Sequence, residues 1–304
     1  MSEPVIEVHN FRKCYGDYVA VENISFEVKQ GEIYGLLGPN GAGKTSTLES
    51  LEGLRTPDRG TLRVAGVDPS RDTRGLRNVI GVQLQTSGLP ANITVDEAMR
   101  FFCAYHGVEP NADLLARLGL GEKLQTQYSE LSTGQQRRLA LALALAHKPQ
   151  VLFLDEPTAG LDVGTRVELH NLMNEEKQRG ATILLATHDM AEAEEMSDQI
   201  GILLHGKLVA SGTPMEITAT GAGLTKVSVR TEQKCLGDDG AGFPAVESSV
   251  TKDDYHIFFS TDIGPTVGAI IQYVEAKGDR LIDLRVERPS LEDRFLEITS
   301  EELV

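Results

Sequence analysis

The 304-residue sequence lacks an apolar run long enough to cross a membrane, because its longest unbroken one covers only residues 139–146. Its first residues, Met1-Ser2-Glu3-Pro4, also lack the basic stretch and the apolar segment that are typical of a secretory signal. We therefore expect a cytoplasmic protein that is at most peripheral to a membrane.

Cysteine and basic side chains are scarce as well. The three cysteines, Cys14, Cys103 and Cys235, show neither a paired spacing nor that of a metal site, so free thiols in a reducing compartment are predicted. The chain has 29 basic against 45 acidic residues and a net charge of −16. This balance disfavours a nucleic-acid partner, which would require a basic surface.

Segments typical of strands and of helices alternate through residues 5–220. Residues 33–37, 151–154 and 182–186 are typical of buried strands, and helical patterns follow at 164–179 and 190–196. A hydrophobic content of 40% is ordinary for a globular chain that buries a large core. The alternation predicts a mainly parallel α/β sheet.

Other parts of this region complete the expected α/β domain. Residues 5–9 and 20–28 show the alternation of half-buried strands, with residues 11–17 predicted as the loop between them. Residues 200–210 predict a hairpin that turns at His205-Gly206. Apolar residues recur at helical intervals over about residues 87–147, which predicts a helical subdomain inserted into the sheet.

A second, smaller domain is expected after a linker at residues 220–223. Its predicted strands and helices are residues 226–230, 255–260 and 281–286, and residues 265–276 and 291–298, respectively. Residues 237–242 are expected to form a surface loop. We therefore divide the chain into a domain of residues 1–222 and an accessory α+β domain of residues 223–304.

The most informative stretch is residues 38–46, between a predicted strand and a predicted helix. It consists of Gly38, Pro39, Asn40, Gly41, Ala42, Gly43, Lys44, Thr45 and Ser46, and fits G-x-x-x-x-G-K-[ST], the phosphate-binding loop. Glycines permit the positive φ that lets backbone N–H groups surround an anion. Lys44 can reach the outer phosphates, and the Thr45 hydroxyl can ligate Mg²⁺. The strand–loop–helix context disfavours a plain glycine-rich turn, so we predict that the chain binds a nucleoside triphosphate.

Two further strand ends carry polar side chains suited to phosphate chemistry. Asp155 and Glu156 follow the apolar residues 151–154, so Asp155 can lie near Mg²⁺ while Glu156 polarises an attacking water. A solvated turn is the alternative, and the buried run before it disfavours that. His188 follows another predicted strand and can hydrogen-bond the γ-phosphate or the water. A structural histidine is equally compatible with its spacing.

A second anion-binding pattern opens the helix predicted at residues 135–147. Ser132, Gly134 and Gln135 lie at its N-terminus, where a hydroxyl and free N–H groups favour an anion. One triphosphate has no need of two such sites. We therefore hypothesise that this one serves the nucleotide of another subunit.

Taken together, residues 5–220 resemble the nucleotide-binding subunit of an ATP-binding cassette (ABC) transporter. The phosphate loop is followed by a signature at residues 131–135, a Walker B strand with its glutamate at 151–156, a D-loop at 159–162 and a switch histidine, His188. Thr133 departs from the family, which usually has glycine there. The resemblance implies an ABC-type P-loop NTPase core with an inserted helical subdomain, followed here by the small C-terminal α+β domain.

The resemblance also implies ligands, partners and further site residues. Tyr15 fits the aromatic that stacks on adenine, with a core aromatic as the alternative, and Gln85 fits the Q-loop glutamine that senses Mg²⁺ and contacts the membrane partner, with Gln83 nearby. ATP and Mg²⁺ are the expected cofactors, with Thr45, Gln85 and Asp155 as metal ligands and no other metal. The expected partners are a second copy of the chain and an integral-membrane permease, on the inner face of the cell membrane.

The end of the chain bears on the direction of transport. Residues 288–296, Arg-Pro-Ser-Leu-Glu-Asp-Arg-Phe-Leu, are similar to the ending of ATPases of drug, antibiotic and polysaccharide exporters, which favours export. A cassette protein acting on nucleic acid or ribosomes is the alternative function, and the single cassette and acidic tail disfavour it. A catalytically silent subunit is disfavoured by the intact Lys44, Asp155, Glu156 and His188.

Overall fold

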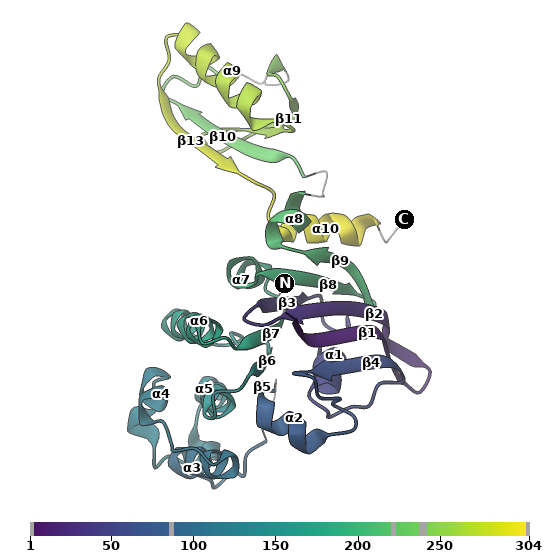
Figure 1. Ribbon diagram of the computed structural model, residues 1–304. Coiled ribbons are helices and arrows are strands. Elements are labelled where there is room, and N and C mark those ends of the chain that lie inside the picture. Colours follow the sequence, from purple (N-terminus) through teal and green to yellow (C-terminus); the bar gives the residue numbers. More distant parts are fainter. Residues whose placement is uncertain (1–2, 85–87, 220–222, 237–241, 302–304) are drawn as a thin grey trace. The chain divides into compact units, whose positions relative to one another are not determined.

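A computed structural model describes residues 3–84, 88–219, 223–236 and 242–301 (Figure 1). The chain forms two compact units, Met1–Pro214 and Met215–Val304. This division falls between Pro214 and Met215, at the first residue of the helix α8 (Pro214–Ala219), whereas the sequence suggested one between residues 222 and 223. Most of the linker and surface loop expected at residues 220–223 and 237–242 lies outside the described residues.

The first unit is built on a six-stranded sheet of order β5-β6-β7-β3-β8-β9. Its strands are β3 (Ile33–Leu37), β5 (Ile80–Gln83), β6 (Val151–Asp155), β7 (Thr182–Thr187), β8 (Gln199–Leu204) and β9 (Lys207–Gly212). All neighbours are parallel except β8 and β9, which form the predicted hairpin through His205 and Gly206, both with positive φ. The mainly parallel sheet is thus confirmed, and β6, β7 and β3 are neighbours whose carboxyl ends meet at one edge.

A second, antiparallel sheet of order β2-β1-β4 lies in the same unit. Its strands are β1 (Pro4–Tyr15), β2 (Tyr18–Lys29) and β4 (Arg59–Val64). The loop expected at residues 11–17 was wrong, because β1 continues to Tyr15 and Phe11 is fully buried. Register shifts between Val8 and Lys13, with Asn10 at positive φ, interrupt the alternation that would have revealed one long strand.

Helices pack on the sheets and form the expected helical subdomain (Figure 1). Beside the sheets lie α1 (Lys44–Leu51), α2 (Thr73–Val79), α6 (Val163–Gln178) and α7 (Met190–Met196). The subdomain contains α3 (Val95–His106), α4 (Ala112–Arg117), two 3₁₀ turns (Gly121–Lys123 and Tyr128–Glu130) and α5 (Thr133–Leu145). One apolar cluster joins α3, α4 and α5 to β6 and β7, and another joins the two sheets around Phe11, Tyr34 and Phe153.

The second unit has a four-stranded antiparallel sheet of order β11-β12-β10-β13. Its elements are β10 (Thr225–Thr231), β11 (Val246–Lys252), β12 (Tyr255–Ser260), α9 (Ile263–Ala276), β13 (Leu281–Glu287) and α10 (Leu291–Glu301). Ile270 and Val274 of α9 pack on Val227, Val229 and Phe258 of the sheet. The strand β11 was missed because six of its seven side chains are exposed and five are polar, so no apolar alternation marks it.

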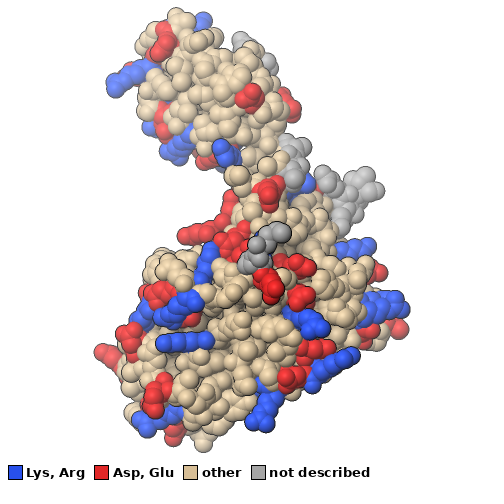
Figure 2. All heavy atoms as spheres, viewed as in Figure 1, with Lys and Arg blue, Asp and Glu red and all other residues tan. Residues whose placement is uncertain are grey.

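No helix among the described residues is both long and apolar enough to span a bilayer. On the face that Figure 2 shows, basic and acidic side chains are interspersed, and no continuous basic surface is formed there.

Candidate nucleotide-binding and catalytic site

The phosphate loop leaves the carboxyl end of β3 and leads directly into α1, which begins at Lys44. Gly38, Gly41 and Gly43 all have positive φ, of 156°, 83° and 106°. A side chain at Gly43 would place its Cβ 2.5 Å from the Ala20 carbonyl oxygen, so this position requires glycine for space as well as for conformation. The loop therefore has the fixed backbone that an anion-binding N-terminus needs.

Lys44 is 6% exposed, and its ammonium group is directed back into the loop. Its Nζ donates to the carbonyl oxygens of Gly38 at 2.6 Å and Pro39 at 3.2 Å, and lies 3.8 Å from Glu156 Oε1. Burial lowers the pKa of Lys44, while the charges of Glu156 and Asp155 oppose that shift. A partly desolvated ammonium at this place interacts strongly with phosphate oxygens, because little water screens it.

Thr45 and Asp155 bring two oxygens together from α1 and from the end of β6. The Thr45 hydroxyl donates to Asp155 Oδ2 over 3.1 Å, and burial is the main cause that raises the pKa of Asp155. Hard oxygen ligands of this kind fit Mg²⁺, which proteins usually hold through one or two carboxylates and substrate phosphates. Among the described residues there is no group of three or more His, Cys, Asp or Glu side chains that could hold a metal ion.

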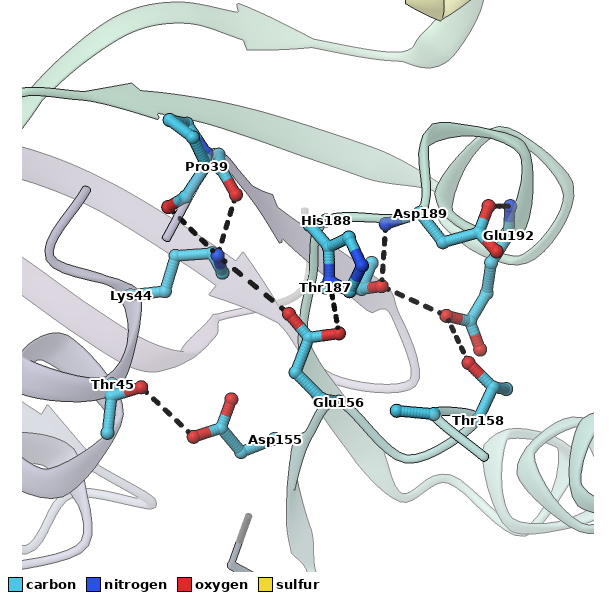
Figure 3. A network of polar contacts seen from close by, with 12 residues as sticks. Pro39, Lys44, Thr45, Asp155, Glu156, Thr158, Thr187, His188, Asp189 and Glu192 are labelled. Atoms are coloured by element: carbon cyan, nitrogen blue, oxygen red, sulfur yellow. Dashed lines mark hydrogen bonds and ion pairs between the residues drawn. The ribbon is translucent and has the colours of Figure 1, made fainter. Parts of the chain in front are cut away.

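Glu156 lies between Lys44 and His188 (Figure 3). Its Oε2 is 2.7 Å from His188 Nδ1, and the carboxylate is largely buried whereas the imidazole is largely exposed. Glu156 adopts a positive φ of 51°, and its N–H donates to the Ala186 carbonyl over 2.9 Å. The turn at the end of β6 is thereby fastened to the neighbouring β7, and the carboxylate faces the phosphate loop.

A cavity of about 330 Å³ opens over these residues. It is lined by Tyr15, Tyr18, Ala20, Pro39, Asn40, Gly41, Gly43, Lys44, Thr45, Ser46, Asp155 and Glu156. Tyr15 is 40% exposed at its wall, so it is not a core aromatic. Sequence reasoning missed Tyr18, whose hydroxyl donates to the Gly41 carbonyl over 3.3 Å. The signal was the Tyr15-Gly16-Asp17-Tyr18 spacing, which places two aromatics at one hairpin turn.

The signature residues begin α5 and are not among the residues that line this cavity. Ser132 caps the helix in a reciprocal arrangement: its Oγ accepts from the Gln135 N–H at 3.3 Å, and Gln135 Oε1 accepts from the Ser132 N–H at 2.9 Å. Gly134 lies beside the D-loop, since a Cβ built there would be 3.6 Å from the Gly160 carbonyl. Ser132, Gly134 and Gln135 therefore do not contribute to the cavity that the phosphate loop of their own chain lines.

The predicted Q-loop glutamine, Gln85, lies outside the described residues. Its neighbour Gln83 is the last residue of β5, is 2% exposed, and is paired in register with Leu154, just before Asp155.

Comparison with known proteins assigns the chain to a family. The model of the family described as ABC transporter matches residues 21–159. The chain is 36% identical to the Nod factor export ATP-binding protein I of Paraburkholderia xenovorans (strain LB400), covering 100% of this chain and 99% of that protein. It is 30% identical to the linearmycin resistance ATP-binding protein LnrL of Bacillus subtilis (strain 168), covering 98% of this chain and 99% of that protein.

Other matches extend the comparison to a longer protein and to solved structures. The chain is 41% identical over 226 residues to the probable multidrug ABC transporter ATP-binding protein YbhF of Escherichia coli (strain K12), and these residues cover 72% of this chain but 39% of that protein. The solved structure of an ATP-binding subunit of an ABC transporter is similar with a TM-score of 0.68 and 30% identity, over 71% of this chain and 92% of that chain.

A dimeric post-hydrolysis structure of the ATP-binding cassette MJ0796, bound to ADP and Pi, is similar with a TM-score of 0.63 and 25% identity, over 68% of this chain and 98% of that one. The chain belongs to the ATP-binding subunits of ABC transporters.

Proposed function

We propose that this chain hydrolyses ATP to power the export of a drug, an antibiotic or a related compound through a separate membrane subunit. The observation that carries the hydrolytic part is the placement of Glu156. Its carboxylate lies 3.8 Å from Lys44 Nζ and 2.7 Å from His188 Nδ1, at the edge of the cavity that the phosphate loop lines.

The residues take separate tasks in this proposal. Lys44 and the loop N–H groups bind the outer phosphates, while Thr45 and Asp155 hold Mg²⁺, which neutralises developing charge on the phosphates when bound. Glu156 orients and polarises the attacking water, and His188 holds Glu156 in place and reaches the γ-phosphate. Tyr15 stacks on the adenine from the wall of the cavity.

Export is supported by the relatives that match this chain over nearly its whole length. Their names assign them to Nod factor export and to linearmycin resistance, and both include a region corresponding to residues 215–304. The multidrug relative supports the same direction, although this chain spans only 39% of its length. The alternative of an ABC protein that acts on nucleic acid gains no support from these relatives or from the net charge of −16.

The active form is proposed to be a homodimer that closes over two ATP molecules. Ser132 and Gly134 support this arrangement, because they form an anion-binding helix start that does not line the cavity of their own chain. The solved dimeric cassette with which the chain shares 25% identity gives a precedent for such a pair.

The membrane subunit is proposed to dock on an apolar groove between the sheet and the helical subdomain. This groove, of about 490 Å³, is lined by the exposed side chains of Leu54, Leu84, Phe101 and Tyr105. Leu84 directly precedes the predicted Q-loop glutamine, and Gly88, three residues after that glutamine, also lines the groove. The chain would thus be peripheral, on the cytoplasmic face of the cell membrane.

Two measurements test the proposal. Purified chain should release phosphate from Mg²⁺-ATP, and the Lys44→Ala variant should not. Inside-out vesicles that contain the chain and the membrane protein encoded beside its gene should accumulate a labelled antibiotic only when ATP is supplied. Absence of hydrolysis both with and without that membrane protein would overturn the enzymatic part, and ATP-driven loss of the label from the vesicles would overturn the direction.

A further inference from the structure

A buried carboxylate, that of Glu192, lies on the first turn of α7, beside the segments that carry Glu156 and His188 (Figure 3). Glu192 is 4% exposed, and its Oε2 accepts two hydrogen bonds, from Thr158 Oγ1 at 3.0 Å and from Thr187 Oγ1 at 3.1 Å. Both threonines are themselves buried. One carboxylate oxygen therefore joins two segments that come from different parts of the chain.

Each of these two segments contains a side chain that acts in the proposed hydrolysis, Glu156 in one and His188 in the other. Thr158 lies two residues after Glu156, and Thr187 directly precedes His188. We propose that Glu192 is a positioning residue that sets the separation between Glu156 and His188 by tying together the turns after β6 and β7. This inference rests on the proposed ATP hydrolysis, because it concerns the residues that orient the water.

Local hydrogen bonds would transmit a shift of either threonine to the catalytic side chains. The Ala159 N–H donates to the Glu156 carbonyl over 3.3 Å, so the turn that contains Thr158 is closed onto Glu156 itself. On the other side, Thr187 Oγ1 accepts from the Asp189 N–H over 3.0 Å, which fixes the residue on the far side of His188. Displacing Thr158 from Thr187 would therefore change the geometry of the 2.7 Å contact between Glu156 and His188.

The carboxylate of Glu192 is not needed to cap the N-terminus of α7. Asp189 already caps the helix, because its Oδ1 accepts from the Glu192 N–H at 3.0 Å. The second carboxylate oxygen, Oε1, lies 3.6 Å from His170 Nε2, and neither atom has a hydrogen-bond partner within the part of the chain that the structure describes. Burying a carboxylate is costly, and an apolar side chain would fill this place without that cost. The hydrogen-bonding role that remains for Glu192 is its contact with the two threonines.

The test removes the hydroxyl groups and leaves Glu156, His188 and the phosphate loop unchanged. Thr158→Val and Thr187→Val are nearly isosteric and each deletes one of the two hydrogen bonds to Glu192. We expect each to lower the kcat of ATP hydrolysis by about tenfold to a hundredfold, since small displacements of reacting groups have effects of this size. The KM for ATP should stay within about twofold, because neither residue lines the nucleotide cavity.

Two control variants separate positioning from general damage. Thr158→Ser restores the hydroxyl and should recover most of the lost kcat. Thr182→Val removes a hydroxyl from an equally buried threonine at the opposite end of β7, where it contacts Gly31 and Lys29 and not Glu192, and should leave kcat unchanged. Since both threonines act through one carboxylate, the Thr158→Val/Thr187→Val double variant should lose no more than the more severe single variant.

The outcomes distinguish this inference from the proposed function. If the wild-type chain hydrolyses ATP but Thr158→Val and Thr158→Ser have the same kcat, Glu192 has no positioning role. A double variant whose loss is the product of the two single losses would also overturn the inference. A lower melting temperature with unchanged kcat would show a purely structural role. A wild-type chain without ATPase activity would instead refute the proposed function.

Discussion

His188 Nδ1 and Lys44 Nζ approach the two oxygens of one carboxylate, that of Glu156, at 2.7 Å and 3.8 Å. Glu156 and His188 directly follow β6 and β7, and Lys44 begins α1 after the phosphate loop that leaves β3. These three strands are adjacent in the sheet, in the order β6-β7-β3. Both oxygens of Glu156 therefore face donors, and the carboxylate is restrained at the wall of the nucleotide cavity. A neutral amide of the same shape would keep the place of Glu156 without its charge.

The first prediction is that Glu156→Gln leaves ATP binding intact and stops hydrolysis, because the amide cannot polarise an attacking water. ATP should then hold two copies together, and the variant should elute as a dimer from a sizing column with ATP and as a monomer without it. The wild-type chain under turnover is the control. Turnover near the wild-type rate would contradict the role of Glu156.

The second prediction concerns Tyr15, which is 40% exposed at the wall of the cavity. Tyr15→Ala should weaken ATP binding about tenfold, in line with the roughly 1–3 kcal/mol of a base–aromatic stack. Tyr15→Phe keeps the ring and should bind nearly as the wild type does. Calorimetric titration with ATP in the Glu156→Gln background measures both. Unchanged affinity together with a lower melting temperature would show that Tyr15 only supports the fold.

The third prediction uses two glycines with positive φ in different surroundings. Gly43→Ala should abolish measurable ATP binding and lower the melting temperature by several degrees. An alanine at this positive φ costs about 1–2 kcal/mol of backbone strain, and its Cβ would also collide with the Ala20 carbonyl oxygen. Gly66→Ala is the matched control, since Gly66 has a φ of 77° and open space around it. Equal melting temperatures for the two variants would show that the Gly43 turn can relax.

The fourth prediction concerns Glu52, whose carboxylate oxygens are buried and without a partner in the described part of the chain. Burial, with Asp155 and Glu49 nearby, raises its pKa from 4.5 to about 8. Between these values the folded state holds a proton that the unfolded state releases, so the free energy of unfolding falls as the pH rises.

The Glu52→Gln variant should lack this pH dependence. Its free energy of unfolding relative to that of the wild type should therefore increase from pH 5 to pH 8. The gain should be at most about 1.4 kcal/mol per pH unit. Urea midpoints at each pH measure it, with the exposed Glu122→Gln as the control. Parallel curves for the wild type and Glu52→Gln would contradict the buried, protonated state of Glu52.

The fifth prediction tests whether Ser132 and Gly134 serve the site of the partner chain. Lys44→Ala damages a phosphate loop, and Gly134→Asp sets a negative charge against the phosphates. Each variant also carries Glu156→Gln, which prevents turnover. If the signature acts across the interface, one site of a mixed dimer has both defects and the other has none.

Mixing the two variants should therefore trap about one ATP per mixed dimer, since the intact site keeps its charge-assisted contacts with the phosphates. Filter retention of radiolabelled ATP measures the trapped amount, with each variant alone as the control. Retention no greater than in either variant alone would mean that the signature acts within its own chain.

The phosphate loop could be predicted from sequence because its chemistry is local. Gly38, Gly43 and Lys44 act through backbone conformation and reach within one loop, so their spacing alone defines the geometry. The same holds for Asp155 and Glu156, which an apolar strand delivers to the edge of a sheet, and for the hairpin at His205 and Gly206, which both take positive φ. Short-range steric contacts determine such features, so a few consecutive residues are enough to predict them.

The full length of the strand β1 could not be predicted from short-range patterns of this kind. Asn10 takes a positive φ of 49°, and irregular pairing with β2 moves Phe11 into the core against the expected alternation. The position of Phe11 depends on the packing of two sheets, which is not encoded in the period of one segment.

The sequence by itself determined the family, the phosphate loop and the acidic pair, each of which consists of neighbouring residues. Only the tertiary structure decided that Glu156 meets both Lys44 and His188, that Ser132 and Gly134 do not line the nucleotide cavity of their own chain, and that Glu192 joins Thr158 to Thr187. The physical reason is strand order. The contacts of Glu156 and Glu192 exist because β6, β7 and β3 are adjacent, and burial of the whole chain, not any single stretch, selects that order.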